Sequence, residues 1–266
     1  MRGLLERRRG ERAASRVEMD LSTAEGTNEL IFYLVVRFVL VMLAVMTLVD
    51  QSIPQEAGMT IFRIDRLCGG VMIFGLTFVM LFTAMTVAKD RSGAFLMRMY
   101  ASPMTAGDFT AGYLLPMLAI ALVQAVLIGA AALLIALITG FDLSVGGLLL
   151  AIPALLPSAV FFCALGLLLG TLFNEKSAPG LCSIIISLGS FLGSVWFDAE
   201  ATGGVLLKIS QWLPFHYCTK TVRSAIMLDL TGRAFWLPLA VTVGWAVIAA
   251  VCAALVFRSR MRAELA

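Results

Sequence analysis

The sequence has little charge, and its apolar stretches contain no acidic residue at all. Charged residues make up 14% of the 266 positions and hydrophobic residues 60%, whereas a soluble domain is about a quarter charged and about half apolar. This composition excludes an ordinary soluble domain, because so much apolar surface could not be hidden from water. The apolar residues fall into six blocks: 31–49, 67–88, 113–139, 148–173, 179–197 and 234–257.

The length of the blocks indicates membrane spans. About 20 residues at about 1.5 Å rise per residue cross the roughly 30 Å hydrocarbon core of a bilayer. The sequence therefore predicts an all-α membrane protein with six transmembrane helices in a single domain, residues 31–257. A polar tail, residues 1–30, precedes it without a cleavable signal, and a short tail, residues 258–266, follows.

The distribution of Lys and Arg predicts the orientation. Placing the amino terminus in the cytosol assigns thirteen of them to the cytosolic side and six to the opposite side. The cytosolic side of a membrane protein collects Lys and Arg, so both termini are expected there. The net charge of +3 is then a signal of topology and not of nucleic-acid binding.

Residues that support metal binding or catalysis are scarce. His216 is the only histidine, and the five cysteines are scattered without a C-x-x-C pair, so we expect no metal site. Ion-coupled carriers usually place a carboxylate at membrane depth, and none of the six blocks contains one, so that class is disfavoured. The sequence also lacks the G-x-x-x-x-G-K-[ST] phosphate loop, so an ATPase that drove this protein would be another chain.

Arg37 and the glycine pairs inside the blocks leave more than one interpretation open. Arg37, the one charge within a block, either snorkels to the cytosolic interface or lines an inner cavity or cytosolic gate. Gly166 with Gly170, and Gly189 with Gly193, have the spacing that lets helix backbones approach closely. Either pair could pack within the chain, and Gly189 with Gly193 is also a candidate dimer interface.

The segment between the second and third blocks predicts a cytosolic amphipathic helix at about residues 89–102. Its apolar side chains share one face, and a Ser-Pro pair ends it. Such a helix lies on the lipid headgroups or docks into a partner. The candidate contact residues are Asp90, Arg91, Phe95, Leu96, Met99, Ser102 and Pro103.

These features resemble the type-2 ABC exporter permeases, which include drug-resistance and antibiotic-export subunits. The resemblance rests on the charged, Gly-containing helix after the second block, on the turn at 101–105 and on the polar turn that ends 168–175. At 212–217 the run Trp-Leu-Pro-Phe-His-Tyr, with Arg223 after it, is similar to the family's Leu-Pro-x-x-Tyr element. The resemblance covers about residues 67–257.

The resemblance implies a half-transporter whose amphipathic coupling helix contacts a separate ABC ATP-binding subunit, present in two copies. That subunit would hold ATP and Mg, this chain would hold no cofactor, and it would not be an enzyme. A second permease copy, identical or a paralogue, would complete the pathway. Residues of about 198–233 would form short outer helices that partly re-enter the membrane. Their candidate residues are Trp212, Pro214, Tyr217 and Arg223.

The function that the resemblance implies is ATP-driven export across a bacterial cytoplasmic membrane by alternating access. Apolar side chains in the spans indicate a hydrophobic or amphipathic substrate, such as a drug, antibiotic, peptide or lipid. The sequence departs from the family at residues 89–92, where Lys-Asp-Arg-Ser replaces a Glu-rich start. An ion-coupled secondary transporter, a non-transporting membrane scaffold and a membrane enzyme around His216 are the alternatives.

Overall fold

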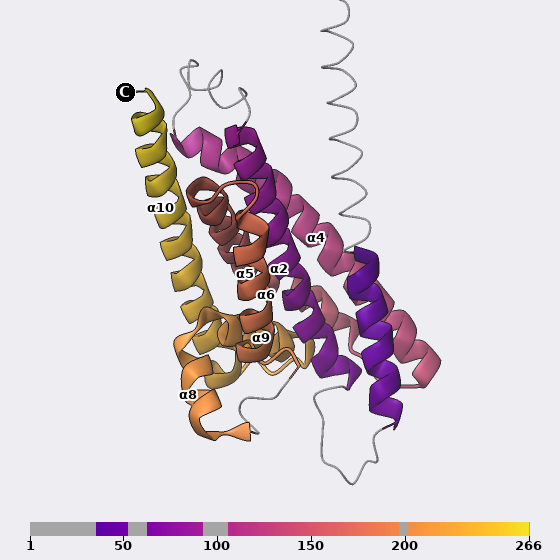
Figure 1. The fold of residues 1–266 in the computed structure, drawn as a ribbon. Coiled ribbons are helices and arrows are strands. Elements are labelled where there is room, and N and C mark those ends of the chain that lie inside the picture. Colours follow the sequence, from indigo (N-terminus) through magenta and orange to yellow (C-terminus); the bar gives the residue numbers. More distant parts are fainter. Residues whose placement is uncertain (1–35, 53–62, 93–105, 197–201, 266) are drawn as a thin grey trace, which may run out of the picture. The chain divides into compact units, whose positions relative to one another are not determined.

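The chain divides into two compact units, residues 1–38 and residues 39–266. Of the first unit only the last three residues are described, and they are helical. The described part of the second unit contains helices, turns and no strand (Figure 1). The computed structural model describes residues 36–52, 63–92, 106–196 and 202–265.

Four helices are long and apolar enough to cross a membrane, which confirms the all-α fold expected of a membrane protein. These helices are α2 (Ile64–Ser92), α4 (Ala106–Thr139), α5 (Val145–Leu172) and α10 (Leu237–Leu265), the last preceded by the π-helical turn η2 (Gly232–Trp236). The shorter helices are α6 (Ala178–Leu192), α8 (Gly204–Trp212) and α9 (Pro214–Ile226), and residues 36–52 are also helical.

The other two expected spans are not among these four helices, so the total of six stays a prediction. Residues 36–52 are helical, and the first five residues of the first block, 31–35, lie outside the described residues. The fifth block forms α6, whose 15 residues cover about 22 Å at about 1.5 Å per residue. The expected end at Phe197 is wrong, because α6 ends at Leu192. Ser194 has a φ of 58°, which is incompatible with a continuing right-handed helix.

Two other helices run past the expected boundaries. The second block was expected to end at Ala88, but α2 continues to Ser92, so Asp90 and Arg91 belong to α2. Lys, Asp and Arg side chains are all compatible with a helix. The last helix, α10, likewise continues to Leu265, so the expected tail is helical from Arg258 onward, and its place in the cytosol stays a prediction.

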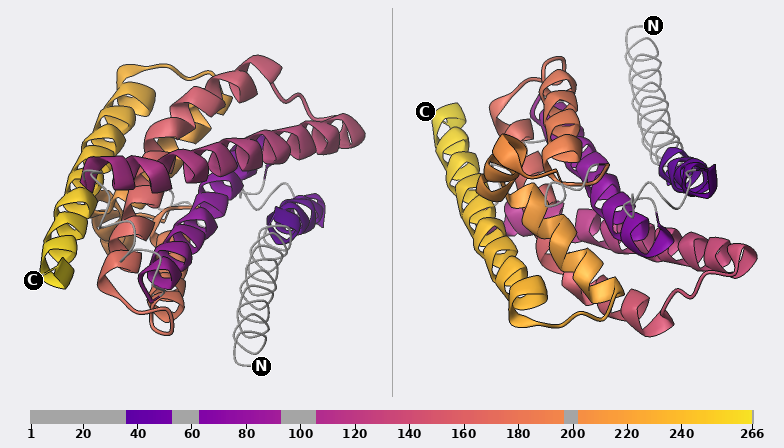
Figure 2. Two further views of the ribbon diagram at one scale, coloured as in Figure 1. Left: turned by 90° about the horizontal axis from the view of Figure 1, so that it is seen from above. Right: turned by 90° about the horizontal axis from the view of Figure 1, so that it is seen from below.

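Helices α2 and α5 form the centre of the packing. α2 contacts α4, α5, α6 and α9, and α5 also contacts α4, α9 and α10. In its most apolar 18-residue stretch α2 buries 72% of its residues and α5 56%, against 33% for α4 and 17% for α10. Figures 1 and 2 show α10 along one side of this group. The exposed apolar surface of α4 and α10 fits contact with lipid or with another membrane chain.

Two glycines allow α5 to lie against α2. A Cβ atom on Gly166 would stand 2.8 Å from the Cβ of Thr83, and one on Gly170 would stand 2.8 Å from the Cβ of Val87. Both distances are well inside van der Waals contact, so neither position has room for a side chain. This glycine pair therefore packs within the chain, as its spacing allows.

Candidate functional site

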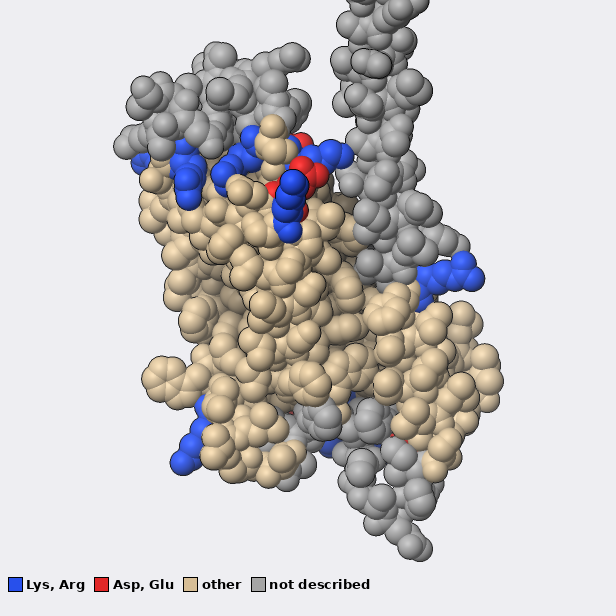
Figure 3. All heavy atoms as spheres, in the orientation of Figure 1, with Lys and Arg blue, Asp and Glu red and all other residues tan. Residues whose placement is uncertain are grey.

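Charged side chains gather at the end of α2 where residues 93–105 lead to α4, and an uncharged band lies beside them on the face that Figure 3 shows. We call this region, with the start of α4 and the turn at residues 173–177, the Asp90 end. The opposite region comprises the start of α2, the turn at residues 193–196 and α9. We call it the Arg223 end.

Two hydrogen bonds at the Asp90 end fasten α2 to its neighbours. The Tyr113 hydroxyl donates to the Asp90 carboxylate over 2.8 Å, which joins α2 to α4. The Arg91 guanidinium donates to the main-chain carbonyl of Thr171, which joins α2 to the last turn of α5. The carboxyl-terminal end of α2 is therefore held by two other long helices.

The bond from Arg91 follows from the electrostatics of a helix end. The last carbonyls of an α-helix lack partners within the helix and carry a partial negative charge. Helix α5 has no basic residue in its own last turn. Arg91 supplies the missing positive charge from α2.

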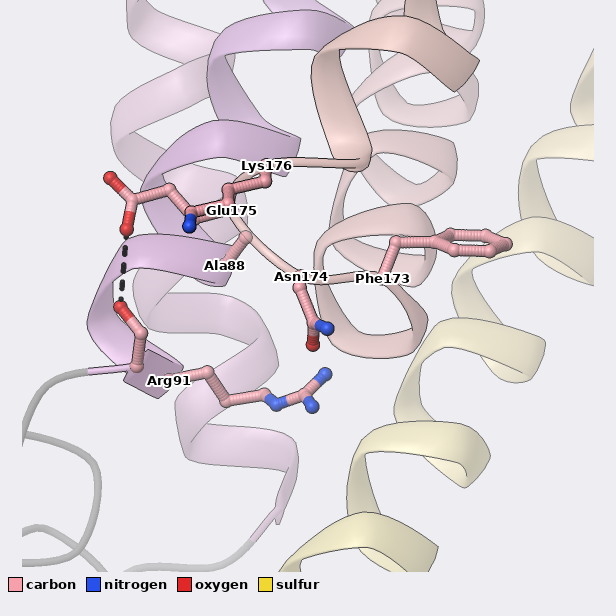
Figure 4. A pocket seen from close by; sticks show the side chains of 7 residues that line it. Ala88, Arg91, Phe173, Asn174, Glu175 and Lys176 are labelled. Atoms are coloured by element: carbon pink, nitrogen blue, oxygen red, sulfur yellow. Dashed lines mark hydrogen bonds between the residues drawn. The ribbon is translucent and has the colours of Figure 1, made fainter.

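A pocket of about 420 Å³ lies beside this junction (Figure 4). On one side the Ser92 hydroxyl donates to the Glu175 carboxylate over 3.3 Å, so α2 also meets the turn between α5 and α6. The Phe173 side chain extends in the opposite direction from Glu175 in Figure 4. Both signs of charge line the pocket, which suits contact with a polar protein surface. The lining residues are Ala88, Arg91, Ser92, Phe173, Asn174, Glu175 and Lys176.

The structure brings two of the predicted contact residues, Asp90 and Arg91, into this junction. Their partners Tyr113 and Thr171 were not identified from the sequence. One signal in the sequence pointed to this region. The polar turn that includes Glu175 lies between two apolar blocks, on the same expected side of the membrane as the coupling helix. The other predicted contact residues lie outside the described residues: Phe95, Leu96, Met99, Ser102 and Pro103.

Arg223 joins three parts of the chain at the opposite end. Its Nε donates to the Arg66 carbonyl over 2.9 Å, and its Nη2 donates to the Val195 carbonyl over 3.2 Å. Its side chain lies against Gly69 and Gly70, where an added Cβ would stand 2.9 Å from Arg223 atoms in each case. Arg223 thus links α9 to α2 and to the turn after α6.

The other residues predicted for the outer element have different surroundings. Trp212, at the end of α8, is 86% exposed. Pro214 is buried as the first residue of α9, a position where the missing N–H of proline costs nothing. Tyr217 is half-buried with its ring edge-on to His216. The expected short helices are thus present as α8 and α9, and their depth in the membrane stays a prediction.

The candidate gate and dimer residues have the following places. Arg37 is exposed in the helix at 36–52. Gly189 of α6 and Gly193, which follows the helix, face Phe215 of α9, and added Cβ atoms would stand 3.2 Å and 3.1 Å from its side chain. The pair therefore has a partner within the chain, and a role in a dimer stays a prediction.

His216 has a polar partner that the sequence pattern does not identify. The Ser194 hydroxyl lies 3.0 Å from His216 Nδ1, and both residues are buried. No cluster of three or more His, Cys, Asp or Glu side chains that could hold a metal ion occurs within the described residues.

The comparison with known families decides the assignment. A family model described as ABC-2 type transporter matches residues 25–227. The chain belongs to the ABC-2 type transporter family. This confirms the resemblance to type-2 ABC permeases, although the match begins before the expected residue 67 and ends before α10. No curated protein matches the chain.

Family membership makes the chain the permease subunit of an ABC transporter. The ABC-2 membrane domain is a non-catalytic transmembrane subunit that associates with an ABC ATP-binding subunit. Together with the long apolar helices, it makes this ABC-2 permease a multi-pass membrane protein.

Proposed function

We propose that this ABC-2 permease is part of an ATP-driven exporter that moves a hydrophobic or amphipathic substrate across a bacterial cytoplasmic membrane. The substrate would be a drug, an antibiotic, a peptide or a lipid-like compound. Support comes from the family match and from helices with no Asp or Glu in their apolar blocks, which suit a cargo without charge at membrane depth.

The proposed topology has six spans with both termini in the cytosol. The helix at 36–52, with the residues before it, would be the first span, and α6 with the residues after it the fifth. The Asp90 end would face the cytosol and the Arg223 end the outer side. The excess of Lys and Arg on the side of the amino terminus supports this orientation.

The observation that carries the coupling mechanism is the pair of bonds from Asp90 and Arg91. Residues 93–105 connect α2 to α4, and at this junction α2 is bonded to α4 through Tyr113 and to α5 through Thr171. A partner that displaced this segment would therefore act on three long helices together. ATP and Mg, bound by two ATPase subunits, would drive the displacement through contacts that differ between two states.

The pathway would lie between two permease copies. Arg37 would face it from the cytosolic side as a gate. Helix α6 would contribute to the dimer interface, with Gly189 and Gly193 keeping it close to α9. Its exposed apolar side chains support this role, because they recur at helical spacing: Ile184, Leu188 and Phe191.

The test is affinity purification of the tagged chain from its native membrane in mild detergent. A variant with Phe95→Asp and Leu96→Asp should lose the ATPase subunit that the wild-type chain retains. The matched control carries Val205→Asp and Leu206→Asp in α8, which contacts α9 of the Arg223 end, and should retain the ATPase subunit. Recovery of no nucleotide-binding protein with the wild-type chain would contradict the proposal.

Flux in inside-out vesicles separates the exporter from its alternatives. An exporter accumulates a lipophilic dye when ATP is present, even with the ion gradient collapsed. Flux that needs the gradient would indicate an ion-coupled carrier. An ATPase partner without any flux would indicate a scaffold.

A further inference from the structure

One polar side chain, that of Gln124, is buried in the contact between α2 and α4 (Figure 2). It lies near the middle of α4, and its surface is 2% exposed. Its Nε2 atom is buried and donates to no group within the described residues. A glutamine inside a membrane protein ordinarily donates across to a neighbouring helix, because the hydrocarbon offers no acceptor. An unpaired buried amide costs free energy, so it requires an explanation.

The amide lies directly against the backbone of α2 at Gly75. A Cβ atom on Gly75 would overlap Gln124 Nε2 and stand 3.0 Å from Gln124 Cδ. Any side chain at position 75 would therefore take the space of the amide. We call this space the Gly75 slot. The Gln124 side chain fills it without gaining a hydrogen bond from any of the described residues.

The rest of the buried face of α4 consists mainly of small residues. Between residues 121 and 136, all of which are described, Gln124 is the one buried residue with a polar side chain. Short side chains make few dispersion contacts, so few contacts oppose the free-energy cost of the unpaired amide. Apart from Ile128, the other buried residues of this stretch are Ala121, Ala125, Gly129, Ala132 and Ala136.

A second contact between the same two helices lies at the Asp90 end. The Tyr113 hydroxyl donates to the Asp90 carboxylate over 2.8 Å, and both residues are partly exposed. Water can replace the lost partner when such a bond opens, so its opening costs little. The two helices are therefore joined by an exchangeable bond at one end and by an unpaired amide in the middle.

We propose that Gly75 and Gln124 form a conformational switch that favours separation of α4 from α2. With the helices in contact, the amide occupies the Gly75 slot without a hydrogen bond. When α4 moves off α2, the amide reaches a main-chain carbonyl or entering water and regains its hydrogen bonds. The pair thus lowers the free-energy cost of moving α4. This inference goes beyond the proposed export function and depends on neither the substrate nor the ATPase.

The experiment measures the separation of α2 and α4 in the purified full-length chain, with any ATPase subunit that accompanies it and without nucleotide. Nitroxide spin labels are attached to Lys89→Cys on α2 and to Gly112→Cys on α4, with the native cysteines replaced by Ala. Each label is adjacent in sequence to a residue of the bond between Asp90 and Tyr113. Dipolar broadening of the spectrum gives the ratio of separated to paired labels. The thermal unfolding midpoint of each variant is measured in parallel.

The first variant, Gln124→Met, keeps the length and the helix propensity of the side chain and removes the amide. It should raise the unfolding midpoint, because a buried donor without a partner is lost, and lower the ratio of separated to paired labels about tenfold. The matched control, Gln211→Met, makes the same change at an exposed position of α8 and should alter neither quantity.

The second variant, Gly75→Ala, places a methyl group in the Gly75 slot, where the nearest atoms are the far end of the flexible Gln124 side chain. The amide must then leave, so the ratio of separated to paired labels should rise. The double variant Gly75→Ala with Gln124→Ala has no such conflict, and its ratio should be at or below that of the wild type. This comparison decides the question where the wild-type chain shows no separated labels.

Three results would overturn the proposal. An unfolding midpoint that does not rise in Gln124→Met would mean that the amide has a partner in the wild-type chain. A higher midpoint with an unchanged ratio of labels would mean that Gln124 affects packing alone. A double variant that separates as much as Gly75→Ala would mean that the two residues do not act through each other.

A failure to fold does not leave the switch untested. If Gly75→Ala does not fold, the double variant must fold, because its methyl group takes space that the amide has left. A double variant that also fails to fold would contradict the proposed slot. Because neither readout uses ATP or a substrate, failure of this inference is distinct from failure of the export proposal.

Discussion

The two ends of the helical bundle are held together differently. At the Asp90 end, side chains on α2 reach single groups on α4, on α5 and in the turn after α5, beside a pocket with exposed charged residues. At the Arg223 end, one side chain lies against two glycines and donates to two main-chain carbonyls, while most of α9 around it is buried.

This difference teaches which end can rearrange. Few, partly exposed polar bonds exchange with water at little cost, because water replaces the lost partner. A guanidinium packed against glycine backbone has no such substitute. We therefore expect the contacts of the Asp90 end to rearrange during transport. The contacts of the Arg223 end should stay intact, so that this end moves as one piece.

The largest effect should come from overpacking the contact between α5 and α2. Replacing Gly166 and Gly170 together by Ala forces methyl groups against the α2 backbone, and we expect about 3 kcal/mol or more loss of stability. Thermal unfolding in detergent measures it. The controls Gly180→Ala and Gly244→Ala, which meet no atom within 4 Å, should be neutral or stabilising.

The next effect compares one arginine from each end. Arg223→Met strands the carbonyls of Arg66 and Val195 and should lower the free energy of unfolding by about 2–4 kcal/mol. Arg91→Met strands the carbonyl of Thr171 at a more exposed end and should lower it by about 1–2 kcal/mol. Arg91→Met should nevertheless reduce ATP-dependent flux severalfold. A greater loss of stability in Arg91→Met than in Arg223→Met would reverse the comparison.

A smaller effect comes from one oxygen atom. Tyr113→Phe removes the bond to Asp90, and we expect about 1 kcal/mol loss of stability with weaker coupling of ATP hydrolysis to flux. Tyr217→Phe removes a hydroxyl at the Arg223 end and serves as the matched control. Equal flux defects in the two variants would argue against a special role for the Asp90 junction.

The smallest expected effect is the lack of reaction between the Cys218 thiol and an alkylating reagent. Burial raises the pKa of the Cys218 thiol to about 11, so the reactive thiolate is rare at pH 8. Cys218 should resist iodoacetamide in native membranes, whereas Ser92→Cys, at an exposed position of the Asp90 end, should react. In both proteins compared, the one that keeps Cys218 alone and the one that also carries Ser92→Cys, the other four native cysteines are replaced by Ala. Rapid reaction of Cys218 would show that the Arg223 end opens.

Much of the fold could be predicted because hydrophobic blocks determine membrane helices. The central helices α2, α4 and α5 fall where their blocks are. The end of α6 could not be predicted, because it depends on the positive φ of Ser194, which an apolar pattern does not encode.

The candidate site could be predicted only in part. Asp90 and Arg91 were visible as charges at the end of a block. Their partners depend on tertiary packing, which brings Thr171 of α5 next to Arg91 across 80 positions of sequence. The bond from Arg223 to the Arg66 carbonyl was invisible for the same reason.

Helix α2 is continuous from Ile64 to Ser92, and this continuity makes it a rod of about 43 Å at about 1.5 Å per residue. The Arg66 carbonyl, which Arg223 holds, is near one end of the rod, and Arg91 is near the other. An α-helix stretches little along its axis, so a piston movement of α2 at one end appears almost undiminished at the other. The two ends of the bundle therefore share one mechanical part, and its length sets the distance over which a signal can be carried.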